Sequence, residues 1–460
     1  MYTTAFKKYT SGSSRFYQEA CQWLPGGVSA NIKYFSPYPL VMKEADGPCL
    51  IDVDGNRYID YNLSYGALIL GHGHPAIVAA IQSQLQEAGT TTFGTPHLLE
   101  QEMGQLLVQL YPSIEKVRYT HSGMEAALLA IRLATAWTGK RKIAKFEGHY
   151  HGSFDQVLVS VNPSQRSRSQ APVPTADSYG MPDEITKNTL VLPFNDMEQT
   201  KALLEKHVHE IGAVILEPVQ AGFIPPDPAF LKELRKMTRK WNMVLIFDEV
   251  KTGFRMGLSG AQGFYGVSPD LTALGKVLGG GFPLGVVGGR KEIMELCSPL
   301  RGTNILSTES DGVKYKPLFH SGTHNGHPLI LTAGLTTLQL LKKDKVYRDL
   351  EQNTMKLRRG MEQILEQYGL PGKTVGVGSI FNLVMTEQPV RQIQDVLQSD
   401  QALRKKLDAF LLEQGIYVKP LNRFSTAITH TSEIIGETLD RFERGIRKLT
   451  GKEDFVVARS

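Results

Sequence analysis

The feature that most constrains the fold is an alternation of short apolar runs with helical segments between about residues 75 and 290. Short apolar runs flanked by amphipathic helices are typical of a parallel sheet that is covered on both faces. The pattern therefore predicts an α/β fold with a mostly parallel central sheet and helices on both of its faces. The runs are VRYT, KIAKF, AVILEP, VLIFDE and DLTALG.

The two ends of the chain follow a different pattern. Residues 37–62 combine apolar runs with the turn signals ADG and DGN, which predicts short strands. After residue 330, apolar spacing of three and four predicts helices, followed by short strands and a final helix at 432–449. The predicted parts are a large domain over 70–335 and a smaller α+β domain formed by 1–69 and 336–460.

Composition excludes several classes of protein. The 460 residues carry 51 basic and 46 acidic side chains, and this net charge of +5 does not gather into the basic stripe of a nucleic-acid binder. No apolar run reaches the roughly 18 residues of a membrane span. The cysteines at 21, 49 and 297 have no C-x-x-C spacing, which argues against a disulfide framework and a zinc site. We expect a soluble cytoplasmic protein with no membrane and no nucleic-acid partner.

Candidate functional residues lie where the predicted strands end, because ligands of open α/β sheets bind outside the carboxyl ends of the strands. After VRYT, Ser122 and Gly123 stand at the entry to a periodic helix that Gly139 closes. Free backbone N–H groups at such an entry can bind a phosphate. The alternative is that Ser122 is an ordinary helix N-cap.

The run VLIFDEV carries apolar residues directly into Asp248 and Glu249. An ionised carboxylate at the end of a buried strand is costly unless it meets a cation or a donor. We therefore expect a positively charged group opposite Asp248. It could belong to a ligand, or to an arginine or helix N-terminus in a purely structural contact.

A single lysine, Lys276, interrupts the otherwise uncharged stretch LTALGKVLGGGFPLGVVGG. Apolar surroundings disfavour the ammonium form, which makes the amine available as a Schiff-base nucleophile. The neighbouring glycines are interpreted as a surface that a flat ligand approaches closely. The alternative is a lysine that extends to the protein surface.

The three strand ends together indicate one ligand. A phosphate cradle, a buried acid and an isolated lysine match the phosphate, ring nitrogen and aldehyde of pyridoxal 5'-phosphate (PLP). The sequence therefore predicts a PLP site at the carboxyl edge of the sheet.

Longer motifs resemble the class III PLP-dependent aminotransferases of fold type I, and within that family the glutamate-1-semialdehyde 2,1-aminomutases. The resemblance covers roughly residues 14–450, and it implies a PLP-binding large domain and a homodimer with both active sites at the interface. The motifs include HSGMEAALLAIRLA, KFEGHYHG, AVILEPV, LIFDEVKTGFR, GAQGFYGVSPDLTALGKVLGGGFPLGVVGGR and HSGTHNGHPL.

The resemblance also implies residue roles. Lys276 would form the internal aldimine, and Asp248 would hold the ring nitrogen protonated. Tyr150 would stack on one face of the ring, with Val250 on the other. The remaining implied contacts are to the phosphate, from the backbone of Ser122, Gly123 and Met124 and from Thr323 of the partner subunit.

Departures from the aminomutase pattern bear on the substrate. Lys33 and Tyr65 stand where the aminomutases have an arginine and a tryptophan beside the substrate, and a lysine lacks the bidentate fork of arginine. Arg423 lies where related aminotransferases keep a mobile arginine for the substrate carboxylate. We hypothesise that Glu217 and Arg423 form a gate; the alternative is that Arg423 is a surface arginine.

The predicted function is transfer of an amino group between a carboxylate-bearing amine, possibly a non-α-amino acid, and a keto acid. The alternatives are a glutamate-1-semialdehyde-type aminomutase and a PLP-binding scaffold without turnover. Histidine pairs in GHGHP, GHYHG and KHVHE have a spacing that can bind metal. Because the first two fall inside motifs of a family that binds no metal, we expect no metal site.

Overall fold

The computed structural model describes residues 4–163, 170–301 and 318–452. The chain divides into two compact units, which are described separately. Unit 1 contains Met1–Pro75, Lys345–Pro389 and Asp395–Ser460, and unit 2 contains Ala76–Asp344 and Val390–Gln394.

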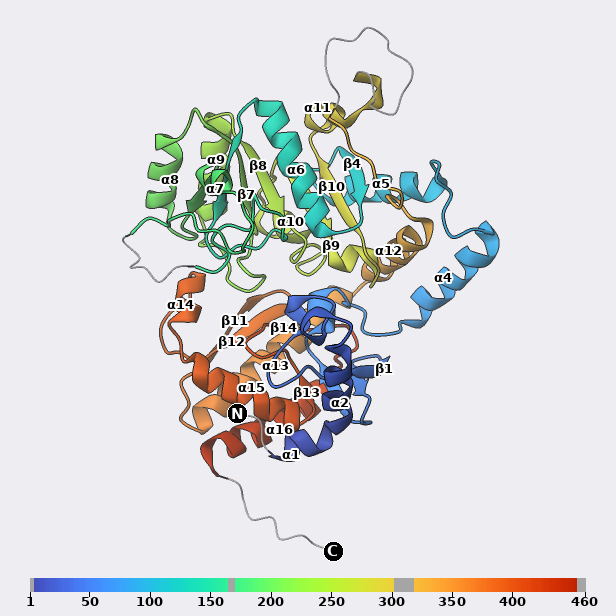
Figure 1. The fold of residues 1–460 in the computed structure, drawn as a ribbon, viewed down its shortest axis with the longest axis vertical. Helices are drawn as coiled ribbons and strands as arrows, with labels where there is room; N and C mark the ends of the chain where they lie inside the picture. The colour runs from blue at the N-terminus through green and yellow to red at the C-terminus, as the bar shows by residue number, and fades with distance from the viewer. Residues whose placement is uncertain (1–3, 164–169, 302–317, 453–460) are drawn as a thin grey trace, which may run out of the picture. The chain divides into compact units, whose positions relative to one another are not determined.

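Unit 2 is built on a seven-stranded sheet, counted over the residues that the structure describes, with the order β4-β10-β9-β8-β7-β5-β6 (Figure 1). Strand β10 is antiparallel to both of its neighbours, and the pairs from β9 to β6 are parallel. The mostly parallel sheet predicted from the apolar runs is confirmed. The strands are β4 (Lys116–Thr120), β5 (Lys142–Phe146), β6 (Thr189–Leu192), β7 (Ile211–Leu216), β8 (Val244–Asp248), β9 (Leu271–Gly275) and β10 (Gly285–Gly289).

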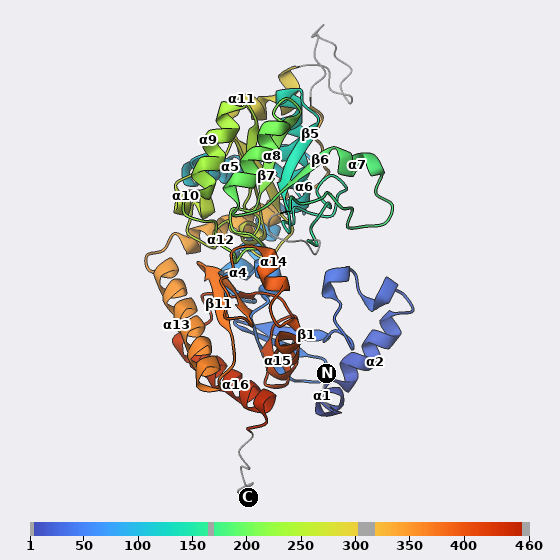
Figure 2. The same cartoon turned by 90° about the vertical axis from the view of Figure 1, so that its left-hand side faces the viewer.

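Helices cover both faces of this sheet, as Figure 2 shows for α6 and α9. One face packs on α6, whose buried stripe meets Ile246 of β8 and Ala273 of β9 in a fully buried core. On the other face, Phe230 of α9 makes an edge-to-face contact with Phe146 of β5. The helices of unit 2 are α4 (Pro75–Ala88), α5 (Leu98–Leu110), α6 (Gly123–Thr138), α7 (Asp183–Lys187), α8 (Met197–Lys206), α9 (Phe230–Lys240), α10 (Gly260–Tyr265), η3 (Lys276–Gly279), α11 (Lys291–Met294), η4 (Glu295–Cys297), η5 (Pro299–Arg301) and α12 (Pro328–Leu341).

Several glycines of the cluster pack closely against neighbouring protein, a role that the sequence interpretation did not include. A Cβ at Gly285 would collide with the carbonyl of Ser122, and one at Gly288 with the side chain of Ile114. A Cβ at Gly280 would likewise meet the carbonyl of Ala333. These glycines let strand β10 and the turn before it pack against neighbouring protein.

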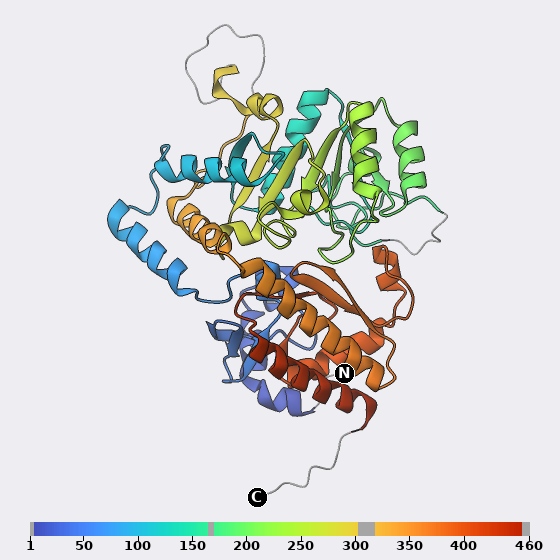
Figure 3. The same cartoon turned by 180° about the vertical axis from the view of Figure 1, so that it is seen from behind.

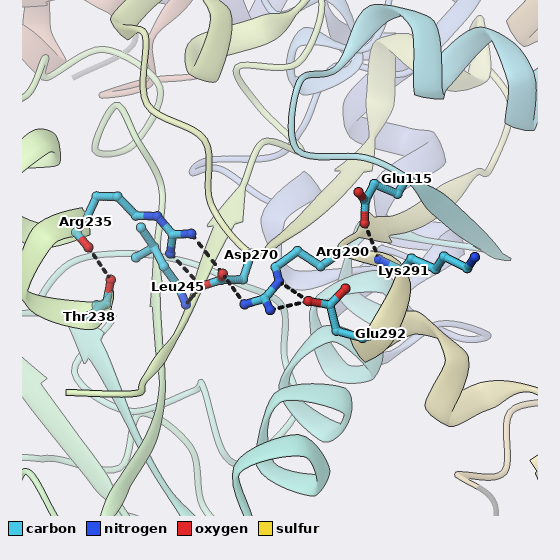
Figure 4. Close-up of polar contacts among 8 residues, drawn as sticks. All are labelled: Glu115, Arg235, Thr238, Leu245, Asp270, Arg290, Lys291 and Glu292. Carbon is cyan, nitrogen blue, oxygen red and sulfur yellow. Dashed lines mark hydrogen bonds and ion pairs between the residues drawn. The ribbon is translucent and has the colours of Figure 1, made fainter. Parts of the chain in front are cut away.

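Asp270 ties several elements of unit 2 together at the amino end of β9 (Figure 4). Arg235 of α9 donates two hydrogen bonds to its carboxylate, at 2.6 and 2.9 Å. Arg290, which follows β10, donates a third at 3.1 Å, and the backbone N–H of Leu245 a fourth at 2.9 Å. This carboxylate therefore links α9, β8, β9 and β10.

Unit 1 contains a four-stranded sheet of order β1-β2-β3-β13 and a three-stranded sheet of order β11-β12-β14, within its described residues. Long helices α13 and α16 run side by side on the back of this unit (Figure 3) and contribute Leu357 and Phe442 to its buried core. The strands are β1 (Met42–Asp46), β2 (Cys49–Asp52), β3 (Arg57–Asp60), β11 (Lys373–Val377), β12 (Ile380–Val384), β13 (Ile416–Tyr417) and β14 (Phe424–Ser425). The helices are α1 (Thr4–Tyr9), α2 (Ser11–Ala20), η1 (Pro25–Gly27), η2 (Asn31–Lys33), α3 (Leu63–Gly66), α13 (Val346–Gln367), α15 (Gln401–Glu413) and α16 (Ser432–Thr450), and α14 (Ile393–Leu397) lies at the boundary of the units.

Among the helices of the described ranges, none combines the length and the apolar composition needed to cross a membrane.

Candidate active site

The carboxyl edge of the unit 2 sheet brings three predicted functional segments together: the turn at Ser122, Asp248 and Lys276. Strand β10 lies between β4 and β9, and Gly285 is the register partner of both Thr120 and Gly275. The turn that begins at Ser122 therefore comes after β4, on one side of β10, and Lys276 comes directly after β9, on the other side. In β8, Asp248 pairs in register with Ala273 of β9, which places the acid one strand further along.

Ser122 is the N-cap of α6, and its Oγ accepts a hydrogen bond of 3.2 Å from the backbone N–H of Glu125. The first helical hydrogen bond runs from Ala126 to the Ser122 carbonyl. The N–H groups of Gly123 and Met124 precede it, so they are available to an anion at the positive end of a 16-residue helix. The capping side chain and the anion-binding backbone are thus compatible at one turn.

Glycines bring this turn into contact with the other two strand ends. A Cβ at Gly123 would lie 2.5 Å from Cγ2 of Val250. A Cβ at Gly275 would lie 3.4 Å from the Cα of Gly123 and 3.4 Å from Cγ1 of Val250. The turn of Ser122 and Gly123 (the expected phosphate turn), Val250 after the acid pair, and Gly275 before Lys276 therefore meet at one point.

Asp248 is 4% exposed, and both of its oxygens have partners. Nδ1 of His151 lies 2.7 Å from Oδ2, and the backbone N–H of Val250 donates to Oδ1 at 3.0 Å. The side chain of His151 is fully buried. Sequence reasoning did not assign this histidine to Asp248, although the motif GHYHG contains it. A carboxylate has about four acceptor positions, so Asp248 keeps capacity for one further donor.

Lys276 begins the short helix η3 directly after β9 and is partly buried. Its backbone φ of 47° lies in the left-handed region, which is strained for a residue other than glycine. Strained backbone of this kind is common at functional sites. A helix N-terminus, a carboxylate with spare acceptor capacity and a lysine at one edge fit the phosphate, ring nitrogen and aldehyde of PLP.

Tyr150 lies beside this edge with 45% of its surface exposed, as a side chain that covers a ligand requires. Burial of part of the ring, together with the negative charge of Asp248, raises the pKa of Tyr150 above its ordinary value. Met124 and Thr323 are exposed as well, Thr323 in the turn before α12. The phosphate contact that we expect from Thr323 of the partner subunit stays a prediction.

Glu217 follows β7 and is 1% exposed. Its ion partner within unit 2 is Lys251, a residue that sequence reasoning did not consider. Burial alone would raise the pKa of Glu217, but the neighbouring Lys251 ammonium and His151 hold it below its ordinary value. The gate between Glu217 and Arg423 stays a prediction.

Unit 1 groups three of the residues expected near the substrate. Tyr65 belongs to a strained turn in which Leu63, Ser64 and Tyr65 all have positive φ, of 46°, 52° and 58°. The Tyr65 hydroxyl donates to the carbonyl of Ile32 at 2.9 Å, and its own carbonyl accepts a 3.2 Å hydrogen bond from Arg423.

Lys419 donates to the same Ile32 carbonyl, which makes it a second cation of this cluster that sequence reasoning missed. Burial lowers the pKa of Lys419 below its ordinary value. Lys33 is exposed and donates to Ser29 at 2.8 Å. The cluster of Tyr65, Lys419 and Arg423 has the chemistry of a carboxylate receptor.

The paired histidines have structural partners. Nδ1 of His149 accepts a 2.9 Å hydrogen bond from the backbone N–H of Glu217, which fixes it as the unprotonated nitrogen. His72 contacts Asp60 at 2.8 Å, and His207 contacts Glu210 at 3.0 Å. In the ranges that the structure describes, no group of three or more metal-ligating side chains is suited to a metal ion.

Comparisons with known proteins identify the family of this chain. Residues 33–446 match the family model described as aminotransferase class-III. The glutamate-1-semialdehyde 2,1-aminomutase of Methanopyrus kandleri is 41% identical over 443 residues, which cover 95% of this chain and 98% of that protein.

Solved structures are similar over nearly the whole chain. The crystal structure of an omega-transaminase from Sphaerobacter thermophilus is 34% identical, with a TM-score of 0.90, and the match covers 97% of this chain and 100% of that one. A beta-phenylalanine aminotransferase from Variovorax paradoxus is 30% identical with a TM-score of 0.84, covering 99% and 97%. The chain belongs to the class III aminotransferases, which are PLP-dependent enzymes of fold type I.

Proposed function

We propose that this enzyme transfers an amino group between a carboxylate-bearing amine and a keto acid. The observation that carries the proposal is the meeting of Gly123, Val250 and Gly275, which brings the phosphate turn, Asp248 and Lys276 to one edge. This arrangement supports reversible chemistry at an amine carbon.

PLP, when bound, supplies an aldehyde that condenses with amines and a ring that withdraws electrons from the carbon next to nitrogen. The N–H groups of Gly123 and Met124 would bind its phosphate, Asp248 would hold a proton at its ring nitrogen, and Lys276 would hold its aldehyde carbon. With a substrate amine in place of Lys276, Nζ of Lys276 would act first as base and then as acid, taking the proton from the substrate carbon and delivering it to the former aldehyde carbon of the cofactor.

Carboxylate recognition is the part of the proposal that concerns the substrate. Arg423 and Lys419 supply two cations beside Tyr65, and Arg423 can bind a carboxylate through two parallel N–H groups. Lys33 adds a point charge in the same unit. We therefore propose an amino acid, of the α or a non-α class, as the donor.

An aminomutase is the second candidate, and the identity of 41% to a glutamate-1-semialdehyde 2,1-aminomutase favours it. The two reactions differ in their products. The deciding experiment incubates the PLP-loaded enzyme with a keto-acid acceptor and either a panel of amino acids or glutamate-1-semialdehyde, and measures released keto acid and isomerised substrate. A transferase releases a keto acid from the donor, whereas a mutase returns an isomer of glutamate-1-semialdehyde and releases none.

The same preparation tests for turnover of any kind. A catalyst exchanges the proton next to the substrate nitrogen for deuterium in D2O, because Lys276 removes and returns it. A scaffold that only binds PLP leaves this proton in place, and that result would contradict the proposal.

We also propose that the enzyme works as a cytoplasmic homodimer in which Thr323 of the partner subunit binds the phosphate. The exposed position of Thr323 supports this arrangement. Light scattering measures the mass of the assembly, and the PLP dissociation constant of Thr323→Val tests the phosphate contact. A monomer with unchanged PLP affinity in the variant would overturn this part.

A further inference from the structure

Two buried carboxylates lie at the ends of neighbouring strands in unit 2. Leu216 and Phe247 are register partners in β7 and β8, and Glu217 and Asp248 are the residues that follow them. Glu217 is 1% exposed and Asp248 is 4% exposed. Like charges this close in a buried setting raise each other's pKa unless each has its own compensating partner. His151 compensates Asp248 in the structure, which leaves the question of what compensates Glu217.

Lys251 compensates the charge of Glu217. Its Nζ donates to Oε1 of Glu217, and its side chain is only 11% exposed. The other oxygen, Oε2, accepts hydrogen bonds from the backbone N–H groups of Tyr150 at 3.1 Å and Ala221 at 3.4 Å. Glu217 is therefore the link between the Lys251 ammonium and the backbone of Tyr150.

The same ammonium also contacts the ring of Tyr150. Nζ of Lys251 lies 5.8 Å from the ring centroid, within the range of a cation–π interaction. Lys251 therefore interacts with Tyr150 in two ways: indirectly with its backbone, through Glu217, and directly with its ring. The backbone and the ring are the two parts of Tyr150 that must be fixed if its side chain is to cover a flat ligand.

We propose that Lys251 is a positioning residue of the cofactor site, which keeps Glu217 ionised and thereby holds Tyr150 in place to cover bound PLP. The proposal rests on the proposed function in one respect, namely that Tyr150 is the residue that covers the cofactor. Lys251 itself forms no bond with the cofactor in this scheme.

The charges around Glu217 determine how the pair depends on pH. From the β5 side, His151, His149 and the buried Lys145 face it, and from the β8 side Lys251 and Asp248 do. Burial, with the positive charges of His151 and Lys145, keeps the pKa of His149 well below its ordinary value, so His149 stays neutral near pH 7. Lys251 is therefore the cation in direct contact with the Glu217 carboxylate among the described residues.

The sign of the pH effect follows from this arrangement. With Lys251 present, the pKa of Glu217 lies below its ordinary value and the carboxylate stays ionised from pH 8 to pH 6. In Lys251→Met the carboxylate loses its cation but remains buried, so its pKa rises. Protonation of Glu217 then weakens the acceptor that holds Tyr150, and it does so increasingly as the pH falls.

The test measures the PLP dissociation constant of the apoenzyme at pH 6 and pH 8, by absorbance titration, for wild type and Lys251→Met. We expect the ratio of the variant's constant to that of wild type to be about tenfold larger at pH 6 than at pH 8, as a linked proton requires. The ratio of the two dissociation constants at each pH cancels the ionisation of free PLP, because that ionisation affects both proteins equally. Thermal unfolding of each apoenzyme shows whether the variant is folded.

Three matched variants complete the experiment. Lys251→Arg keeps the charge and is expected to retain a ratio that does not change with pH. Glu217→Gln and the double variant Glu217→Gln/Lys251→Met carry a neutral amide that cannot titrate, so their ratios are also expected to be independent of pH. If Lys251→Met binds PLP as wild type does at both pH values, or binds it more weakly by the same factor at both, the proposal is overturned.

Failure of this proposal can be distinguished from failure of the proposed function. If the ratio of PLP dissociation constants for Lys251→Met is the same at pH 6 and pH 8 while the wild type transfers amino groups normally, only the positioning role of Lys251 is excluded. Absence of released keto acid and of deuterium exchange in wild type removes the proposed function, whatever the titrations show.

Discussion

Nδ1 of His151 lies 2.7 Å from Oδ2 of Asp248, and both side chains are buried at the carboxyl edge of the sheet. Because a buried carboxylate is stabilised by a donor on one side, its other acceptor positions keep a fixed direction. His151 therefore fixes the direction of the remaining acceptor positions of Asp248, in the same way that a second group orients the base of a catalytic dyad.

Removal of the acid should separate binding from turnover. Asp248→Ala is expected to keep PLP bound through the phosphate turn and Lys276, but to lose kcat by about 10²-fold or more, since the ring nitrogen has no group to hold its proton. Cofactor content by absorbance and steady-state kinetics check both parts. Normal turnover in this variant would contradict the assignment of Asp248.

The histidine behind the acid should have a smaller effect. His151→Phe keeps the ring volume but removes the donor, and a hydrogen bond to a charged group contributes about 1.5–3 kcal/mol. We expect kcat to fall by about tenfold to a hundredfold. His207→Phe, at the exposed His207–Glu210 contact, is the matched control and should leave kcat unchanged.

The identity of the PLP-linked lysine has a spectroscopic test. Lys276→Ala should abolish the visible absorbance band of lysine-bound cofactor and lower activity by at least about 10²-fold. Lys251→Met, measured at pH 8, should keep the band because Lys251 is not the nucleophile. A band that persists in Lys276→Ala would show that another amine holds the cofactor.

Carboxylate binding predicts an effect on KM. Arg423→Ala should raise KM for amino-acid donors by about tenfold or more, because a charge-assisted hydrogen bond to the carboxylate is lost. Lys419→Met should raise it less, since lysine is a point charge without a fork. Arg444→Ala removes an exposed arginine that contacts Gln414 and serves as the control. An unchanged KM for glutamate and alanine in Arg423→Ala would exclude the gate with Glu217.

The cluster around Asp270 predicts a stability effect that is separate from activity (Figure 4). Asp270→Ala leaves the mostly buried guanidinium of Arg235 without its carboxylate, and breaking such a pair costs about 3–5 kcal/mol. Calorimetric Tm values compare it with Glu292→Ala, whose carboxylate is 44% exposed and should matter little.

The pH dependence of this contribution has a definite sign. Burial alone would raise the pKa of Asp270, but the bonds from Arg235 and Leu245 hold it below its ordinary value of 3.8. A lowered folded-state pKa means that the stabilisation is complete above the unfolded value and is lost as pH falls through the folded one. The difference in Tm between wild type and Asp270→Ala should therefore be constant near neutral pH and shrink only in acid.

Strand ends explain why much of the site could be predicted from the sequence. Asp248 and Lys276 follow continuous apolar runs, and such runs are strong signals for buried parallel strands. The partners of the acids could not be predicted in this way. His151 contacts Asp248, and Lys251 contacts Glu217, because β5, β7 and β8 are neighbouring strands. The order of strands in a sheet cannot be predicted from any one segment of the sequence.

Strand β10 was missed for a different reason. Its sequence, GVVGG, has three glycines in five residues, and glycine is depleted in strands. A glycine-rich composition predicts a flexible segment, but in the structure the lack of side chains lets β10 pack closely against its neighbours.

That single strand also limits which substitutions this edge of the sheet tolerates. Strand β10 lies between β4 and β9, and its first residue, Gly285, is the register partner of both Thr120 and Gly275. A Cβ at Gly285 would lie 2.0 Å from the carbonyl oxygen of Ser122. Any side chain at Gly285 would therefore displace the Ser122 turn, so that this position has to stay glycine.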